Sequence, residues 1–197
     1  MHDIAEEAKP AIMLFLVFSL LTGLVYPLFI TGVVQIAMPD KASGSLIVVN
    51  GTVVGSELIG QNFTDMGYFH GRPSAVDYAA NGSGASNLGP SSTRLMEQVS
   101  RRINNIRAEN NLSQSATVPP DLVLASASGL DPHISTEGAM LQVPRVARIR
   151  GLSESEVKVL VYQNIEHALL AIVGQERVNV LRLNLALDDL TSGEAHR

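Results

Sequence analysis

Between Ala11 and Met38 the sequence runs for 28 residues without a single Asp, Glu, Lys, Arg or His. A helix of that length is about 42 Å long, more than the roughly 30 Å that the hydrocarbon core of a bilayer requires. The ten residues before it hold three acids against Lys9, whereas a cleaved signal peptide has a basic start and a shorter apolar stretch. We therefore expect one retained transmembrane helix over residues 11–38, preceded by a tail of residues 1–10.

Small residues recur along this apolar segment. Ser19, Gly23, Pro27 and Thr31 follow one another every four residues and so form a stripe on one side of a helix. Such a stripe lets another membrane helix approach closely, but small residues are also common in membrane helices generally, and both interpretations stay open. Pro27 is in addition the expected position of a kink. With no charged side chain, the segment is not expected to be an ion pathway.

Residues 39–197 are expected to form a single soluble domain, because the chain is too short for two. They carry 13 Lys/Arg and 16 Asp/Glu, a dispersed net charge of −3 that does not favour nucleic acid as a partner. The absence of Cys excludes disulfides, thiolate metal sites and cysteine nucleophiles. One lysine flanks each end of the apolar segment, Lys9 and Lys41, so charge alone does not predict its orientation.

The first half of this domain opens with a hairpin signal. Two β-branched runs flank Asn50-Gly51, the pair of residues that a two-residue hairpin turn prefers. Residues 61–90 are rich in Gly, Ser, Asn and Pro without sustained periodicity, which predicts a long loop that is either functional or disordered. A helix is expected to begin near Thr93, with an apolar stripe of Leu95, Val99, Ile103 and Ile106.

The second half predicts helices followed by a strand. Ser135 is a suitable N-cap for a helix through Leu141, and Pro144 is expected in the first turn of another short helix that Gly151 ends. Ser153 and Glu156 form a capping box. Residues 178–187 alternate, with leucine at 181, 183, 185 and 187, which favours a half-buried strand. The expected fold class is α+β (mixed α/β), with one N-terminal transmembrane helix.

A search for catalytic motifs finds little. The chain has no Gly-x-Ser-x-Gly elbow, no P-loop and no His-Glu-x-x-His pair, so no catalytic residue and no metal ligand is predicted. The segment Asp131-Pro-His133, with Ser126, Ser128 and Ser135 nearby, would fit a hydrolytic triad on a turn, but these residues are equally good turn and cap formers, and the structural interpretation is favoured.

Two further loop features leave alternatives open. The Gly/Ser/Asn-rich loop 81–92 could offer backbone amides to an anion, although such loops more often supply turns and contact surface. Arg72 precedes Pro73 in a stretch with aromatic residues, which suits an interface anchor. Arg72 could equally pair with carboxylates inside the fold.

Several loop motifs, taken together, resemble one family. They are Val54–Gln61, Tyr68-Phe-His-Gly-Arg-Pro-Ser-Ala75, Ser86–Pro90, Ser126-Ala-Ser-Gly-Leu-Asp-Pro-His-Ile-Ser135, Gln142–Ala147 and Arg177–Asn184. In this order, along essentially the whole chain, they are similar to the C subunit of the Kdp-type potassium-transporting ATPase. Polar residues of these loops are the candidate contacts with partner subunits: Gln61, Arg72, Ser74, Asn87, Asp131 and His133.

The resemblance implies an accessory, non-hydrolysing subunit of a high-affinity potassium uptake complex in a bacterial inner membrane. Its implied partners are a channel-like potassium-binding subunit, a P-type ATPase subunit, a small single-helix subunit and membrane lipid. The implied topology is an N-terminus in the cytoplasm and the domain of residues 39–197 on the outer side.

The family is also described as a catalytic chaperone that raises the ATP affinity of the pump subunit. An outer domain cannot touch cytosolic ATP, and this chain lacks a Leu-Ser-Gly-Gly-Gln run. No cofactor is therefore expected to bind firmly, and ATP is expected to be reached only through the pump subunit, by an allosteric effect. The other functions that stay open are a membrane-anchored hydrolase and an anion-binding sensor.

Overall fold

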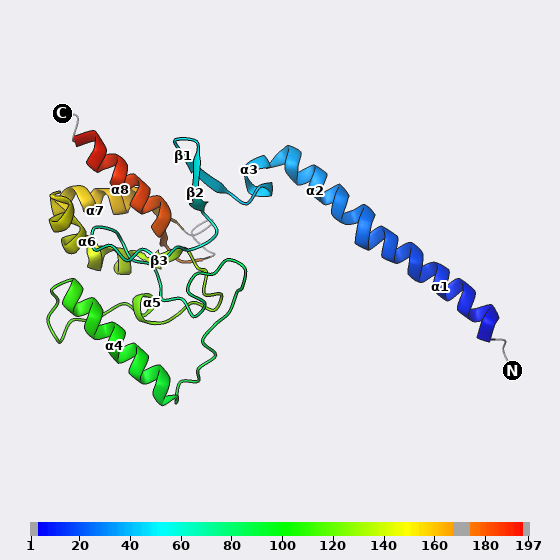
Figure 1. The fold of residues 1–197 in the computed structure, drawn as a ribbon, viewed down its shortest axis with the longest axis horizontal. Coiled ribbons are helices and arrows are strands. Elements are labelled where there is room, and N and C mark those ends of the chain that lie inside the picture. The colour runs from blue at the N-terminus through cyan, green and yellow to red at the C-terminus, as the bar shows by residue number, and fades with distance from the viewer. Residues whose placement is uncertain (1–3, 168–173, 195–197) are drawn as a thin grey trace. The chain divides into compact units, whose positions relative to one another are not determined.

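The computed structural model describes residues 4–167 and 174–194. The chain divides into two compact units, Met1–Leu46 and Ile47–Arg197. Helices and two small sheets make up the described residues, so the predicted mixture of α and β structure is confirmed (Figure 1).

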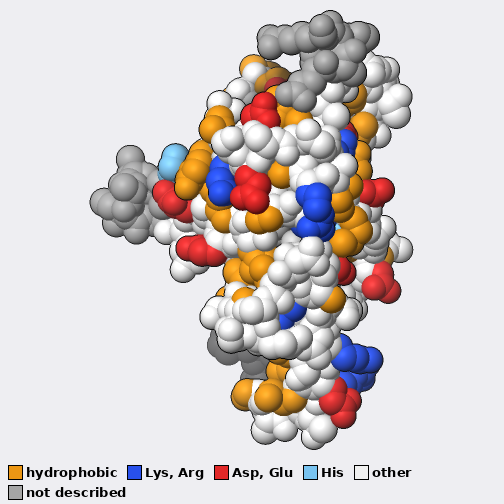
Figure 2. Space-filling view, turned by 90° about the vertical axis from the view of Figure 1, so that its left-hand side faces the viewer, with side chains coloured by type: hydrophobic (Ala, Val, Ile, Leu, Met, Phe, Trp, Pro, Cys, Tyr) orange, Lys and Arg blue, Asp and Glu red, His pale blue; other side chains and the backbone are white. Residues whose placement is uncertain are grey.

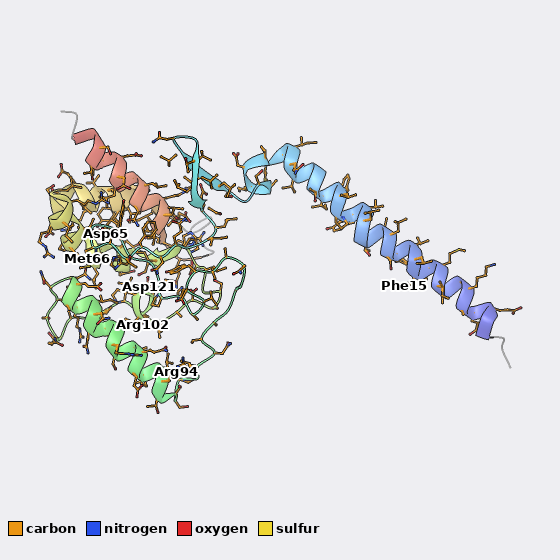
Figure 3. All side chains as sticks on the ribbon, viewed as in Figure 1. Phe15, Asp65, Met66, Arg94, Arg102 and Asp121 are labelled. Carbon is orange, nitrogen blue, oxygen red and sulfur yellow. The ribbon has the colours of Figure 1, made fainter. Side chains whose placement is uncertain are left out.

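The first unit is a long apolar helix. It runs through α1 (Ile4–Leu20), a π-helical turn (Leu21–Val25) and α2 (Tyr26–Ala37), and the short α3 (Pro39–Ala42) follows. The 32 residues Glu6–Ala37 are long and apolar enough to cross a membrane, and none of their side chains is buried. Phe15, 69% exposed, extends away from the helix in Figure 3, as a lipid-facing side chain would.

A π turn stands where a kink at Pro27 was expected. The Tyr26 N–H bonds to the Leu21 carbonyl, five residues back, and Pro27 occupies the first turn of α2. Proline lacks an N–H group and its ring would clash with the carbonyl four residues earlier, here that of Gly23. Widening the helix by one residue just before Pro27 relieves this conflict without breaking the helix.

The second unit begins with a hairpin. Strands β1 (Leu46–Val49) and β2 (Thr52–Ser56) pair around Asn50 and Gly51, both of which have positive φ, so the predicted turn is confirmed. No helix or strand lies between Ser56 and Thr93, a stretch that the structure describes completely. The predicted long loop is thus present, and its Phe69 is fully buried in the core.

The remaining elements build the core around helices α6, α7 and α8. In chain order they are α4 (Thr93–Glu109), α5 (Pro120–Val123), β3 (His133–Ser135), α6 (Thr136–Arg150), α7 (Glu154–Gln163), β4 (Ile165–Glu166), β5 (Arg177–Asn179) and α8 (Val180–Glu194). The three short strands form an antiparallel sheet in the order β3-β5-β4, with Ile134 opposite Val178. Val143, Val157 and Leu183 from the three helices are fully buried together. Helix α4 lies alongside α5 (Figure 1).

Local capping signals are confirmed. The predicted cap Ser135 caps α6 through its side-chain oxygen. Ser92, which is not among the predicted caps, does the same for α4. Ser153 and Glu156 form the reciprocal capping box of α7, and Gly151 ends α6 in the left-handed conformation with φ +72°. These signals involve residues within one helical turn, and therefore depend little on the rest of the fold.

Two predictions for the second half are wrong. Residues 178–187 are not one strand, since β5 ends at Asn179 and Val180 begins helix α8. The helix predicted to end at Leu141 and its short successor are instead the single helix α6, which carries Pro144 inside it. Pro144 is exposed, while Val143, Val146 and Ala147 are buried on the other side of the helix and hold it against the core.

Candidate functional site

Two loops that carry the longest sequence motifs meet in the second unit. Ser74 Oγ donates to the Gly129 carbonyl at 2.7 Å, and the Gly60 N–H donates to the Leu130 carbonyl at 2.8 Å. Arg72 Nη1 donates to Asp131 Oδ2 at 2.9 Å, with both side chains 28% exposed. Arg72, Ser74, Asp131 and His133 are therefore brought together from segments some sixty positions apart. The Gln61 side chain bonds the Val54 carbonyl instead, and Asn87 is exposed.

Basic and acidic side chains alternate through this region. Asp131 Oδ1 accepts from the His133 N–H at 3.0 Å and lies 3.3 Å from His133 Nδ1. His133 Nε2 lies 3.3 Å from Glu166 Oε2, which also accepts from Arg177 Nε at 3.0 Å. We refer to Arg72, Asp131, His133, Glu166 and Arg177 as the ionic chain. It ties the loop at residue 72 to all three strands of the small sheet.

Asp131 is the centre of the ionic chain. Burial by itself would raise the pKa of its carboxyl, but hydrogen bonds from His133 and the positive charge of Arg72 outweigh burial and lower that pKa below its ordinary value. The carboxylate form is thus stabilised in the fold. Asp131 and Asp121 also satisfy the backbone N–H groups of His133 and Ser135, which closes the outer edge of β3 to a further strand.

The hydroxyls near His133 are engaged elsewhere. Ser126 Oγ accepts from the Gly129 N–H at 2.9 Å, Ser128 Oγ accepts from the Leu130 N–H at 3.1 Å, and Ser135 Oγ donates to Asp121 Oδ1 at 3.0 Å. Within the described residues no serine hydroxyl is hydrogen-bonded to His133, and both of its ring nitrogens face carboxylates. A nucleophile–base pair needs that hydrogen bond, so this geometry matches turn and cap formation rather than a hydrolytic triad.

The other predicted site residues serve the local fold. Gln61 Nε2 donates to the Val54 carbonyl at 2.8 Å, and a Cβ at Gly55 would lie 2.1 Å from that nitrogen. In the 81–92 loop the Gly84 N–H donates to the Ser128 carbonyl at 2.9 Å. Asn87 is exposed at a turn with φ +52°. A role for these residues at an interface or with an anion stays a prediction.

Sequence reasoning missed a set of buried polar side chains that hold residues 66–70. Asn184 bonds both the N–H and the carbonyl of Phe69, and Gln142 does the same for His70. Arg145, which is 0% exposed, donates to the Tyr68 and Met66 carbonyls. A signal existed for Gln142 and Arg145, since they interrupt a run of small apolar residues on α6, but polar residues are ordinarily counted as surface positions.

Arg72 is incompletely satisfied. Its Nε is buried and has no hydrogen-bond partner among the described residues. Arg72 also lines a cleft of about 350 Å³ between the loop and α4, together with Tyr78, Arg102 and Glu109; Figure 3 labels Arg102 on α4 and Asp121 on α5. On the face shown in Figure 2, Lys/Arg and Asp/Glu side chains are interspersed, without a block of one sign.

In the first unit, the π turn bears on the stripe of Ser19, Gly23, Pro27 and Thr31. In a regular α-helix each fourth residue advances about 40° beyond a full turn, so a stripe of this spacing drifts around the helix. The wider π turn rotates less per residue, and the four small residues therefore stay closer to one line. Gly23 has no other atom within 4 Å of the position of a Cβ, so the stripe is open in the chain alone.

Comparison with known proteins gives a consistent result. A family model described as K+-transporting ATPase, c chain, matches residues 8–189. A potassium-transporting ATPase KdpC subunit from Polaromonas naphthalenivorans is 54% identical over 185 residues, which are 92% of this chain and 94% of that protein. Proteins of the same name from Nitratidesulfovibrio vulgaris and Caldanaerobacter subterraneus are 51% and 50% identical, over 93% and 92% of this chain and 94% of each relative.

Proposed function

The chain belongs to the KdpC family, the c chain of K+-transporting ATPases, and on that premise we propose that it is the non-hydrolysing accessory subunit that assembles and stabilises an ATP-driven potassium uptake complex. The observation that carries the proposal is the match along residues 8–189, which includes both the membrane helix and the domain. The partners are a channel-like potassium-binding subunit, a P-type ATPase subunit and a small single-helix subunit.

The membrane helix supports a role in assembly. No side chain of Glu6–Ala37 is buried in the chain alone, so lipid and partner helices are the surroundings left to cover them. Without a hydrophobic driving force between helices in lipid, close packing at small residues is a main source of attraction. The stripe of Ser19, Gly23, Pro27 and Thr31 is where we place the contact with a partner helix.

Arg72 is the proposed polar contact of the domain. Its Nη1 bonds Asp131, which fixes the direction of the guanidinium, while its buried Nε keeps an unused donor. A partner carboxylate or carbonyl that reached the cleft would satisfy this donor, and a buried unpaired polar group is costly to leave. Ser74, Asp131 and His133 would then act by holding Arg72 in place.

A packing variant tests the proposal. Gly23→Leu places a large side chain in the stripe of small residues, so that a partner helix can no longer approach closely. The variant is expected to reduce co-purification with the ATPase and channel-like subunits and to slow growth at limiting potassium. Gly32→Leu is the matched control, since Gly32 is equally open but is turned about 100° from Thr31. Equal recovery of the complex with both variants would remove the stripe from the proposal.

We place the N-terminus in the cytoplasm and residues 39–197 on the outer side of the inner membrane, as the family resemblance implies. From there any increase in the pump's ATP affinity has to pass through the membrane helices. Such an effect requires that the chain contacts two pump states unequally. No firmly bound cofactor belongs to the proposal.

A further inference from the structure

The β1–β2 hairpin carries an apolar face that is exposed in the part of the chain that the structure describes. The two-residue turn puts Val48 opposite Val53, and strand alternation places Leu46 on the same face. Leu46, Val48 and Val53 are 53%, 57% and 54% exposed. No charged residue occurs from Ala42 to Ser56, so no like-charged or inward-pointing group protects the strands from association. Contiguous exposed apolar side chains make this face a candidate interaction site.

The hairpin is tethered to the end of the membrane helix. Only residues 38–45 separate Ala37 from Leu46, and four of them form α3. At about 1.5 Å per helical residue and at most about 3.6 Å per extended residue, this connection spans no more than about 25 Å. It is also folded back on itself, because the Ser43 N–H bonds the Pro39 carbonyl at 3.0 Å and the Ser45 N–H bonds the Asp40 carbonyl at 2.8 Å.

The length of the helix places its end near the membrane surface. Glu6–Ala37 contains 32 residues, or about 48 Å of helix, against the 40–45 Å of a bilayer with its headgroup regions. Ala37 therefore lies close to the headgroup layer, and the hairpin lies within reach of the same layer.

We propose that the face formed by Leu46, Val48 and Val53 rests in the interfacial layer of the bilayer that the helix crosses. The inference depends on the membrane helix and not on the proposed role in assembly. Lipid fits this face because it accepts uncharged apolar side chains without demanding a complementary shape, and Lys41 beside it can reach lipid phosphates. Among the described residues β1 pairs with β2 alone. The backbone groups at its outer edge therefore need water or headgroups as partners, which limits the depth.

The chain contains no Trp, so one introduced indole reports on one position. We would place the full-length Val48→Trp protein in phosphatidylcholine vesicles and compare its tryptophan emission with and without brominated acyl chains. The expected result is emission shifted to shorter wavelength and quenched by the brominated lipid. Val53→Trp, on the same face, should behave alike and serves if Val48→Trp does not fold.

Val159→Trp is the matched control. Val159 is a valine of the same unit, on α7, with a similar exposure of 53%. Its tryptophan should emit as in water and escape quenching. Water-like, unquenched emission from both hairpin positions would overturn the proposal, as would equal quenching of the control. Shielding that arises only after the other subunits are added would also overturn it, in favour of a protein contact.

Discussion

The side-chain amide of Asn184 brackets the backbone of Phe69: Nδ2 donates to the Phe69 carbonyl at 3.0 Å, and Oδ1 accepts from the Phe69 N–H at 2.8 Å. The two residues are 115 positions apart, and both are almost completely buried. A helix side chain thus supplies the pair of hydrogen bonds that a neighbouring strand would supply in a sheet. This contact lets the irregular loop pass through the core with its backbone satisfied.

Replacing Asn184 with leucine should destabilise the protein strongly. The substitution leaves a buried N–H and a buried carbonyl without partners, and we expect a loss of about 2–4 kcal/mol in the free energy of unfolding. Denaturant unfolding of the full chain in detergent measures it. Asp189→Ala, at an exposed position of the same helix, should change stability by no more than about 0.5 kcal/mol. A similar loss in both variants would contradict this role for Asn184.

The ionic chain predicts a dependence of stability on pH. Because the pKa of Asp131 is lower in the fold than in the unfolded chain, its carboxylate contributes stability above the ordinary pKa of about 4, and this contribution is lost as the pH falls through the folded value. Wild type should melt at a higher temperature than Asp131→Asn at neutral pH, and the gap should narrow on acidification below about pH 4. A gap that stays constant would show that Asp131 does not titrate in this way.

The proposed topology can be tested with single cysteines, because the chain has none of its own. Lys9→Cys lies near the N-terminal end of the membrane helix, before its uncharged stretch, and Val159→Cys lies in the domain, at an exposed site. In intact cells with a permeabilised outer membrane, a membrane-impermeant maleimide should label Val159→Cys alone, and both sites after lysis. Labelling of Lys9→Cys in intact cells would reverse the orientation.

If the chain raises the ATP affinity of the pump subunit through the membrane helices, it should do so without binding ATP itself. The purified chain should retain no ATP in equilibrium dialysis, whereas omitting it from the reconstituted complex should raise the ATP concentration needed for half-maximal hydrolysis. Direct, saturable ATP binding by the isolated chain would replace the allosteric account with a contact.

Elements whose signals are local could be predicted from the sequence. The Asn50–Gly51 turn, the Ser135 cap and the capping box at Ser153 each depend on a few adjacent residues. The long apolar helix could be predicted equally well, because few structures other than a membrane helix fit an uncharged apolar stretch of this length. The π turn was not, since only the geometry around Pro27 reveals how the helix absorbs that residue.

Helix α8 shows why other elements were missed. The leucines at 181, 183, 185 and 187 alternate as in a strand, yet the fully buried positions Leu183, Asn184 and Leu187 follow helical spacing. Asn184 obscured that spacing, because a polar residue in the core is counted as a surface position until its partner is known. Its partner is Phe69, far away in the sequence, and no local pattern contains that information.

The sequence predicts three residues of the ionic chain, but it does not predict the contacts that connect them. Arg72, Asp131 and His133 are candidate residues from two separate motifs. The structure connects them to Glu166, which lies in none of the motifs, and to Arg177, which opens the motif Arg177–Asn184 but is not a candidate contact. The serines beside them looked equally available for catalysis or for turns. Only their hydrogen bonds to Gly129, Leu130 and Asp121 distinguish the two.

The most direct test of the account is to purify the tagged full-length chain from the membranes of potassium-starved cells and identify what accompanies it. We expect a P-type ATPase and a channel-like membrane protein in equimolar amounts, together with potassium-stimulated ATP hydrolysis in the purified fraction. A chain that is recovered alone under these conditions, with no ATPase activity beside it, would contradict its assignment as an assembling subunit.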